Sequence, residues 1–188
     1  MVFGDSLTHG YGLSAGEPFP DQLEVALRAR EQKVTVINSG NSGDTTASGR
    51  ARVEWALADR PDAVIVELGA NDGLRGLDPA QTYENLDAIV KRFKAEGIPV
   101  LLAGMLAPRN LGPEYVEEFD SVFPRLAAKH DVPLYPFFLE GVALNPDLNQ
   151  ADGTHPNKEG VAVIVSKILP KVEELLAAAR ETGARHGG

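Results

Sequence analysis

The sequence predicts an α/β protein in which helices cover both faces of a largely parallel sheet. Three observations support this fold class. Short apolar runs recur along the chain and end at turn residues, as in strands that are buried on both faces. Longer segments with helical spacing lie between these runs. The composition, with 43% hydrophobic and 24% charged residues, is that of an ordinary globular domain, and the 188 residues are expected to form one domain over residues 1–180.

Five apolar segments are the expected strands. Residues 1–3 come first, directly before a turn, and residues 34–37 and 63–68 follow. Residues 100–103 and a short run at 133–135 complete the set. Because a helical segment separates consecutive strands, we expect parallel pairing through right-handed crossovers.

Helices are expected where apolar residues recur every three or four positions. The stripes are Leu23 and Leu27; Val53, Trp55 and Leu57; and Tyr83, Leu86, Ile89, Val90 and Phe93. The third stripe also has clear boundaries, because Asp78 is a suitable N-cap, Pro79 a suitable first residue and Gln81 a capping-box partner. Gly97 and Pro99 are expected to end that helix.

Two later helices are expected over residues 113–129 and 157–179. Each contains a proline, which lacks the backbone N–H of a helical residue and crowds the preceding turn. Pro124 therefore predicts a kink or break in the first of these helices, and Pro170 predicts a bend in the second. The glycine-containing tail over residues 181–188 is expected to be frayed.

Charge and cysteine content exclude several classes of function. Eighteen Lys and Arg residues against 27 Asp and Glu residues give a net charge of −9, so binding to nucleic acid or to an anionic membrane surface is not expected. The chain has no cysteine, which excludes disulfides, thiolate metal sites and cysteine nucleophiles. No apolar run reaches the about 18 residues of a membrane span, so no stable membrane insertion is expected. The sequence makes no prediction of oligomeric state.

The N-terminus bears on localisation. Residues 1–3 are too short to be a secretory signal, yet the first strand begins almost at residue 1. This suggests that upstream sequence has been cleaved or left out. A periplasmic or secreted location is favoured if a leader has been removed, and a cytoplasmic one otherwise.

Polar residues gather in four loops at the expected carboxyl ends of the strands, where open parallel sheets bind their ligands. The loops are residues 4–8, 38–44, 69–73 and 152–156. They carry the sequences GDSLT, NSGNSGD, GANDG and DGTHP. Catalytic residues are therefore sought in these loops.

Ser6 is the candidate nucleophile, because a strand-to-helix turn beside Gly4 exposes its hydroxyl, although a helix N-cap is the alternative role. His155 is the best candidate for the base. Asp152, three residues earlier, can reach one ring nitrogen and leave the other for Ser6, whereas the alternative is a surface turn that caps the last helix. The other histidines are His9, which lacks a suitable carboxylate, His130, which ends a helix, and His186, which lies in the tail.

Two residues can stabilise negative charge on a substrate oxygen. Gly43 can lend its backbone N–H and Asn71 its side-chain N–H, although each is also a common turn residue. Nucleophile, acid–base pair and oxyanion donors fall in four separate loops at one predicted edge. Their co-occurrence favours a catalytic site over four unrelated turns.

These blocks resemble those of the SGNH hydrolases, also called the GDSL family, over nearly the whole chain. The matching residues are Gly4-Asp5-Ser6-Leu7, Ser42-Gly43-Asp44-Thr45, Gly69-Ala70-Asn71-Asp72 and Asp152-Gly153-Thr154-His155-Pro156. Residues 66–76, 131–133 and 136–138 are similar to the bacterial branch that contains thioesterases, arylesterases and lysophospholipases. The short first strand departs from the family pattern.

The resemblance implies a flavodoxin-like, three-layer α/β/α sandwich with a mainly parallel sheet of five strands. It implies Ser6 as nucleophile, His155 as base and Asp152 as the partner that orients His155. The oxyanion hole would consist of the Ser6 and Gly43 backbone N–H groups and the Asn71 side chain, and no metal or organic cofactor is implied. The implied enzyme is a GDSL-type carboxylic ester hydrolase that cleaves small-molecule acyl esters or thioesters through an acyl-enzyme intermediate.

Residues that contact substrate are expected in loops after the strands, and mainly after the third and fourth, where apolar side chains can wall an acyl groove. The candidates are Asp5, Leu74, Arg75, Leu77, Leu106, Pro108 and Arg109, with Met105, Leu111, Phe138, Leu139, Val142 and Leu144 as further lining. The alternative is that half of the apolar residues pack the core. Arg75 and Arg109 can meet a substrate phosphate, and solvated surface charge is the alternative for both.

Three other functions remain open. A carbohydrate acetyl esterase is the main alternative among hydrolases. Asp5 and Asp72 at strand ends also fit a magnesium-dependent phosphoryl-transfer domain, although the Asp-x-Asp pattern expected after its first strand is absent. The third alternative is a non-catalytic binding module, which the complete set of catalytic residue types disfavours.

Overall fold

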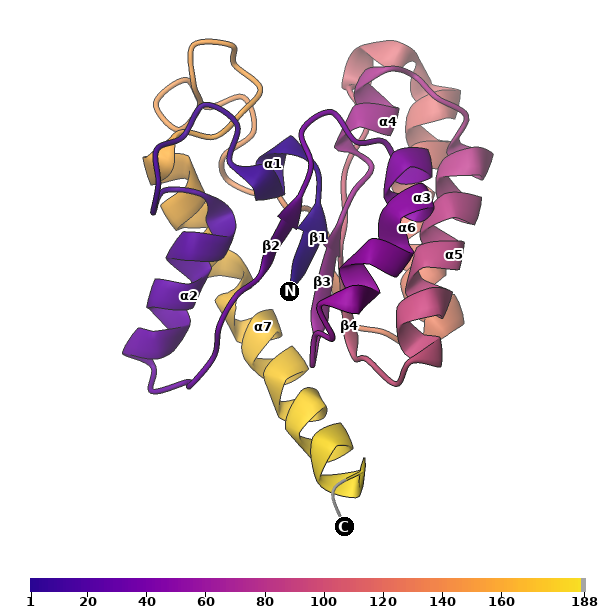
Figure 1. The fold of residues 1–188 in the computed structure, drawn as a ribbon. Helices are drawn as coiled ribbons and strands as arrows, with labels where there is room; N and C mark the ends of the chain where they lie inside the picture. The colour runs from indigo at the N-terminus through magenta and orange to yellow at the C-terminus, as the bar shows by residue number, and fades with distance from the viewer. Residues whose placement is uncertain (187–188) are drawn as a thin grey trace.

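The computed structural model describes residues 1–186, which form three layers around one sheet (Figure 1). The strands are β1 (Val2–Gly4), β2 (Asn38–Gly40), β3 (Val64–Glu67), β4 (Val100–Ala103) and β5 (Leu134–Tyr135). Their order is β2-β1-β3-β4-β5, and every pairing is parallel. This is the strand order of flavodoxin-like sheets, so the predicted fold class is confirmed.

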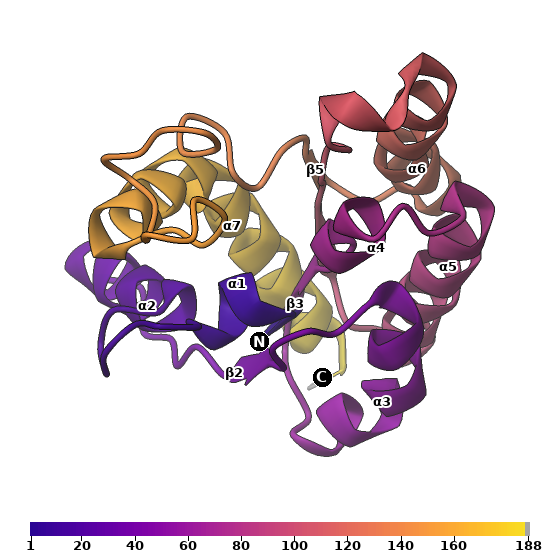
Figure 2. The same ribbon diagram turned by 90° about the horizontal axis from the view of Figure 1, so that it is seen from above.

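Long helices cover both faces of the sheet (Figure 2). On one side lie α2 (Phe19–Ala29) and α7 (Lys158–His186), and on the other lie α3 (Thr46–Ala58), α5 (Pro79–Ala95) and α6 (Pro113–His130). Short helices follow three of the strands: α1 (Ser6–His9), α4 (Ala70–Leu74) and the 3-10 turn η1 (Arg109–Leu111). A helix start at Ser6 was expected from the strand-to-helix turn, whereas α4 and η1 were not, because segments of three to five residues are too short to show a helical period.

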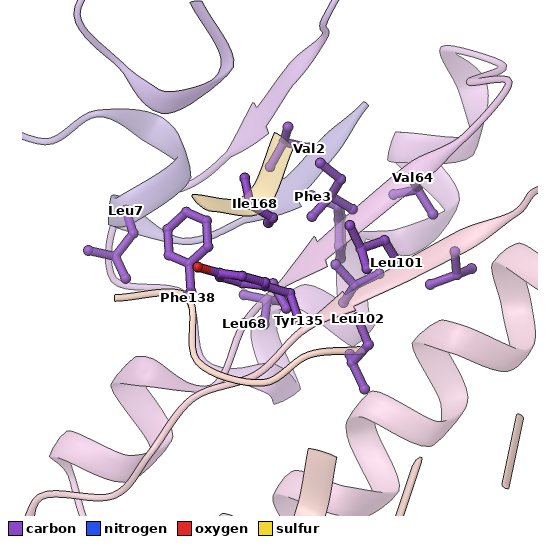
Figure 3. Packing of buried hydrophobic residues seen from close by; sticks show 14 of the residues in the cluster. Val2, Phe3, Leu7, Val64, Leu68, Leu101, Leu102, Tyr135, Phe138 and Ile168 are labelled. Carbon is purple, nitrogen blue, oxygen red and sulfur yellow. The ribbon is translucent and has the colours of Figure 1, made fainter. Parts of the chain in front are cut away.

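The core joins strand side chains to both helical layers. Figure 3 shows residues of β1, β3 and β4 gathered with Phe138 and with Ile168 of α7. Phe3 packs edge-on against Phe93 of α5, with ring centroids 5.6 Å apart. Burial of a side chain of this size contributes about 2 kcal/mol relative to exposure. Gly49 brings α3 close to the sheet, because a Cβ at this position would lie 2.4 Å from Cδ1 of Leu68.

Two predicted elements are shifted in the structure. The second strand covers residues 38–40, whereas the apolar run 34–37 precedes it as an irregular segment. The reason is that β1 offers three residues for pairing, with Val2 opposite Asn38. In α3, Trp55 was predicted on the apolar stripe but is 82% exposed, because Thr46, Gly49, Val53 and Ala56 form the buried face instead.

Helix boundaries confirm some predictions and correct others. Asp78 is the N-cap of α5 and accepts a hydrogen bond from the N–H of Ala80, with Pro79 as the first helical residue. At Pro124 a kink or break was predicted, and the break is wrong, because α6 continues through it and packs Phe119, Val122, Phe123 and Leu126 into the core. Helix α7 is likewise continuous through Pro170. It extends to His186, where a frayed tail was predicted from residue 181, and residues 187–188 lie outside the described part.

Within residues 1–186, no helix combines the length and apolar character of a bilayer span.

A carboxyl group is buried at the end of β3. Glu67 has no exposed surface, and its Oε2 accepts a hydrogen bond of 2.6 Å from the hydroxyl of Thr8 in α1. Its Oε1 has no hydrogen-bond partner among the described residues. Removal from water, followed by the proximity of the Asp5 carboxyl, raises the pKa of Glu67 well above 4.5. Glu67 therefore binds a proton more tightly in the folded chain than in the unfolded chain.

This burial predicts how the stability of a Glu67→Gln variant depends on pH. The stability that protonated Glu67 contributes is fully present below its ordinary pKa of 4.5 and is lost as the pH rises towards the raised pKa. Glutamine has no proton to lose, so unfolding free energies measured in urea should favour the variant increasingly from pH 5 to 8. The gain should be up to about 1.4 kcal/mol per pH unit. Glu84→Gln, at an exposed position on α5, is the control and should show no such trend. A difference between wild type and Glu67→Gln that does not grow with pH would contradict this account.

Candidate active site

Ser6, His155 and Asp152 form a continuous chain of hydrogen bonds. His155 Nε2 lies 2.9 Å from Ser6 Oγ, and His155 Nδ1 lies 2.6 Å from Asp152 Oδ2. The other Asp152 oxygen accepts the backbone N–H groups of His155 and Thr154, at 3.0 and 2.9 Å. The hydrogen bond from the His155 backbone is the main reason that the pKa of Asp152 falls to about 2. An ionised carboxylate only accepts, so Nδ1 carries the ring proton and Nε2 is free to accept the proton of the Ser6 hydroxyl.

Ser6 is the first residue of α1, directly after the turn that ends β1. The N-cap of this helix is Asp5, whose Oδ1 accepts the N–H of Leu7 at 3.0 Å. The alternative role of Ser6 as N-cap is therefore wrong, and its hydroxyl instead contacts His155.

The other histidines lie elsewhere. His9 is exposed, with Nδ1 3.4 Å from the carbonyl oxygen of Gly40. His130 Nε2 lies 2.7 Å from a carboxylate oxygen of Asp87. The side chain of His186 lies outside the described residues. Within the described chain, His155 is thus the histidine that meets Ser6.

The three expected oxyanion donors come from neighbouring loops. None of residues 1–186 accepts a hydrogen bond from the backbone N–H of Ser6 or of Gly43. Gly43 has a φ of +86°, which favours glycine, and a Cβ there would meet no atom within 4 Å, so the approach to its N–H is open. Asn71 Nδ2 donates to the carbonyl oxygen of Asp44 at 2.9 Å and more weakly to Asp5 Oδ2 at 3.3 Å. Since the second bond is long, that hydrogen can be given to a substrate oxygen.

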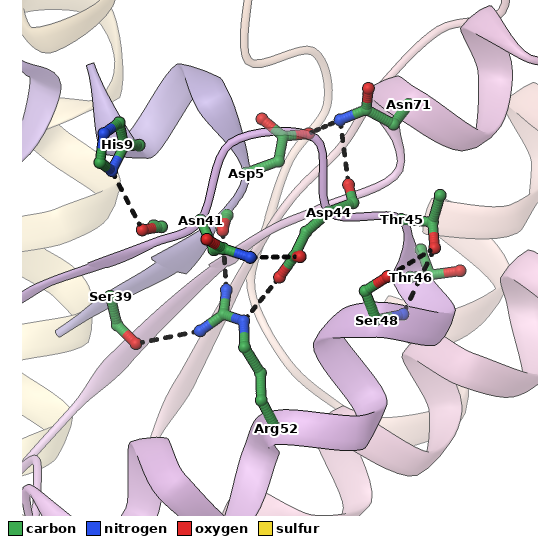
Figure 4. A network of polar contacts seen from close by, with 12 residues as sticks. Asp5, His9, Ser39, Asn41, Asp44, Thr45, Thr46, Ser48, Arg52 and Asn71 are labelled. Carbon is green, nitrogen blue, oxygen red and sulfur yellow. Dashed lines mark hydrogen bonds and ion pairs between the residues drawn. The ribbon is translucent and has the colours of Figure 1, made fainter. Parts of the chain in front are cut away.

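A partly buried ion pair holds these loops together (Figure 4). Arg52 of α3 donates to Asp44 at 2.6 Å, to the carbonyl oxygen of Gly4 at 2.8 Å and to Ser39 Oγ at 3.3 Å. Its guanidinium group also lies 4.2 Å from the centre of the Phe3 ring. One side chain thus connects β1, β2 and the loop that carries Gly43. Arg52 is not among the residues predicted for the site, because a single arginine on a helix has the pattern of a surface charge.

Asp5 and Asp72 hold local structure and are not placed for substrate contact or for a shared magnesium ion. Asp5 was a candidate for substrate contact, but it is fully buried. Burial raises its pKa to about 7, against the lowering effect of the Leu7 N–H and of nearby His155. Asp72 accepts hydrogen bonds from the Thr46 N–H at 2.9 Å and the Thr46 hydroxyl at 2.5 Å. Both carboxyl groups therefore support local structure, which does not favour a shared magnesium site.

The candidate groove residues divide into surface and core. Leu74, Leu77 and Leu106 are 55%, 39% and 39% exposed and follow β3 and β4 at the carboxyl edge of the sheet. Pro108 and Leu139 are half-buried, and Leu111 and Leu144 are exposed. Met105, Phe138 and Val142 are buried in the core. For these three, core packing is therefore the correct alternative and groove lining is wrong.

The two candidate arginines both have protein partners. Arg75 donates to the carbonyl oxygen of Gly43 at 3.1 Å, directly beside the expected oxyanion loop. Arg109 forms an ion pair of 2.6 Å with Asp120, and its side chain stays 57% exposed. Arg75 therefore lies nearer to the expected site than its sequence pattern alone indicates.

Two further residues at the site were missed. The ring of Tyr11 faces that of His155, with centroids 4.8 Å apart and planes inclined by 40°. The side-chain amide of Gln150 donates to the carbonyl oxygens of Tyr11 and of Pro156. Tyr11 lies between two glycines and Gln150 in a polar loop, so each has the pattern of a surface turn residue.

Residues 2–163 match the model of the GDSL-like lipase/acylhydrolase family. Esterase TesA of Pseudomonas aeruginosa is 40% identical over 177 residues, which cover 94% of this chain and 88% of the relative. "Thioesterase 1/protease 1/lysophospholipase L1" of Escherichia coli is also 40% identical over 177 residues, covering 94% of this chain and 84% of the relative.

A solved structure gives the same assignment. AlinE4, described as an SGNH-hydrolase family esterase, is 49% identical with a TM-score of 0.78, covering 93% of this chain and 94% of that chain. The family match spans most of the described fold, and the relatives align along nearly their whole length. The resemblance seen in the sequence is thereby confirmed, and the chain belongs to the GDSL-like lipase/acylhydrolase family.

Proposed function

We propose that this protein is a serine hydrolase that cleaves carboxylic esters, and thioesters, of acyl chains. The observation that carries the proposal is the unbroken contact from Asp152 through His155 to Ser6, at 2.6 and 2.9 Å. Family membership and the names of the relatives, which include an esterase and a thioesterase, support the reaction class. The two bonds, ester and thioester, call for the same attack on a carbonyl carbon.

The chemistry follows from the proton positions. Ser6 Oγ attacks the carbonyl carbon while His155 Nε2 takes the hydroxyl proton, and the ionised Asp152 stabilises the imidazolium that forms. The negative charge on the former carbonyl oxygen is met by the backbone N–H groups of Ser6 and Gly43 and by Asn71 Nδ2. His155 then gives its proton to the leaving alcohol or thiol, which leaves an acyl group on Ser6. A water molecule, activated by His155, releases the carboxylic acid and restores the serine.

Exposed leucines favour acyl chains as the substrate class. Leu74, Leu77 and Leu106 present apolar surface after β3 and β4, at the edge of the sheet where the donors also lie, and an alkyl chain removes such surface from water. A sugar acetyl ester would place polar hydroxyl groups there instead. The carbohydrate acetyl esterase is therefore the second candidate.

Replacement of Ser6 tests the nucleophile. A Ser6→Ala enzyme should lose at least about 10³-fold in kcat for p-nitrophenyl butyrate, because no other described side chain takes the place of the nucleophile. His155→Ala should behave similarly, whereas His9→Ala, at an exposed position, should keep nearly full activity. Wild-type activity should survive EDTA. Activity in Ser6→Ala near the wild-type rate would overturn the mechanism, and loss of wild-type activity in EDTA would favour the metal-dependent alternative.

A variant of Asn71 tests the oxyanion hole. Replacement by alanine removes one donor to the oxyanion, so kcat should fall about 100- to 1,000-fold with little change in KM. Asn85→Ala is a matched control, because this asparagine donates to the Thr46 hydroxyl between α3 and α5. A loss of less than tenfold in Asn71→Ala would show that Asn71 is not an oxyanion donor.

Substrates of different acyl length test the exposed leucines. With p-nitrophenyl acetate, butyrate, octanoate and palmitate, Leu74→Ser should lower kcat/KM for octanoate about fivefold or more relative to acetate, since only the longer chain reaches apolar surface. Val25→Ser, at an exposed site on α2, should change neither. Equal effects on acetate and octanoate, together with faster release of acetate from acetylated sugars, would instead support the carbohydrate acetyl esterase.

A further inference from the structure

The two halves of the proposed acid–base pair come from distant parts of the chain. Ser6 and His155 are separated by 149 positions, yet Ser6 Oγ and His155 Nε2 lie 2.9 Å apart. Ser6 begins α1, whereas His155 lies in the loop that precedes α7. Neither residue lies in a strand, so the hydrogen bonds of the sheet do not by themselves fix the distance between these two atoms.

Gln150 makes these contacts. Its side-chain Nε2 donates to the carbonyl oxygen of Tyr11 at 2.7 Å and to that of Pro156 at 3.0 Å. Its backbone N–H donates to the carbonyl oxygen of His155 at 2.7 Å. Gln150, which is half-buried, thus contacts His155 through its backbone N–H. Its side-chain amide contacts Tyr11, in the turn after α1, and Pro156, directly after His155.

The contact with Tyr11 leads directly to the nucleophile. The backbone N–H of Tyr11 donates to the carbonyl oxygen of Ser6 at 3.1 Å, and the N–H of Gly10 donates to the same oxygen at 3.0 Å. Main-chain bonds therefore connect Ser6 to Tyr11, the amide of Gln150 connects Tyr11 to Pro156, and the Gln150 backbone connects to His155.

A glycine at position 12 leaves space for the side-chain amide of Gln150. Gly12 has a φ of +74°, and a Cβ there would lie 2.1 Å from Gln150 Oε1. Only glycine leaves room for the side chain of Gln150 against this turn. The same arrangement brings the ring of Tyr11 to within 4.8 Å of the His155 ring, measured between centroids.

We propose that Gln150 is a positioning residue that fixes His155 relative to Ser6 by joining their two loops. The inference rests on the proposed hydrolase function and adds a residue to it. Gln150 does not touch the reacting atoms. A displacement of about 1 Å between nucleophile and base lowers turnover by up to about 100-fold, so loss of this connection affects kcat.

The test compares Gln150→Leu with a matched control, Gln22→Leu. Gln22 is also half-buried and also donates its amide to two carbonyl oxygens, those of Glu17 and Lys158, but it contacts neither Tyr11 nor His155. Gln150→Glu keeps the shape of the side chain but presents a carboxylate, which cannot donate, to the same two carbonyl oxygens. Thermal unfolding is measured first, and kcat and KM for p-nitrophenyl butyrate are then measured well below the lowest Tm.

We expect Gln150→Leu and Gln150→Glu to lower kcat about 10- to 100-fold with KM within threefold of wild type, and to slow the reaction of Ser6 with a fluorophosphonate to a similar extent. Gln22→Leu should lose a comparable amount of Tm and keep kcat within threefold. A folded Gln150→Leu with kcat within threefold of wild type would overturn the inference, as would an equal loss in Gln22→Leu. If Gln150→Leu does not fold, Gln150→Glu and the shorter amide of Gln150→Asn decide by the same criteria.

A readout that needs no turnover separates this inference from the proposed function. The proton on His155 Nδ1, hydrogen-bonded to Asp152, gives a low-field proton NMR resonance that depends on the position of the ring. If wild type and Ser6→Ala are equally inactive, the proposed function fails, and the NMR comparison still applies. Loss or broadening of this resonance in Gln150→Glu but not in Gln22→Leu supports the positioning role, and an unchanged resonance refutes it.

Discussion

The turn from β1 into α1 is the constraint on which the site depends. Gly4 lies so close to its neighbours that a Cβ would stand 2.1 Å from Thr8 Oγ1 and 2.5 Å from Glu67 Oε2. Its carbonyl oxygen accepts the N–H of Asn41 at 3.0 Å and a guanidinium hydrogen of Arg52 at 2.8 Å. Because no side chain intervenes, the turn is held from below by β3 and from the side by the loop that carries Gly43. The position of Ser6 follows from this packing.

The pKa values of the carboxyl groups around this turn are shifted in opposite directions by their surroundings. Asp152 lies at the surface, and backbone N–H groups stabilise its charged form, which lowers its pKa to about 2. Asp5 and Glu67 lie beneath the turn without access to water, and burial raises the pKa of both. The carboxylate of Asp152 is thus ionised next to Nδ1 of His155, where an imidazolium forms. The interior carboxyl groups serve instead as hydrogen-bond partners of α1.

The sequence predicted the fold class and the meeting of Ser6, His155 and Asp152, because these features depend on periodicity and on the rule that parallel strands present their carboxyl ends together. It did not predict the register of β2, which depends on how much of β1 is available for pairing. Of the kink or break expected at Pro124, the break does not occur, because packing of α6 against the core outweighs one missing hydrogen bond. Arg52 and Gln150 act through carbonyl oxygens of other loops, and no local pattern records such contacts.

The lengths of the outer strands have a consequence for behaviour in concentrated solution. The two edges of the sheet are β2, with three residues, and β5, with two. An edge strand exposes unpaired N–H and C=O groups that can recruit a strand from another molecule, and the hazard grows with the length of the exposed ladder. Edges this short offer few such groups in a row, so the sheet presents little template for intermolecular β-pairing, and the folded protein is guarded against aggregation through its sheet edges.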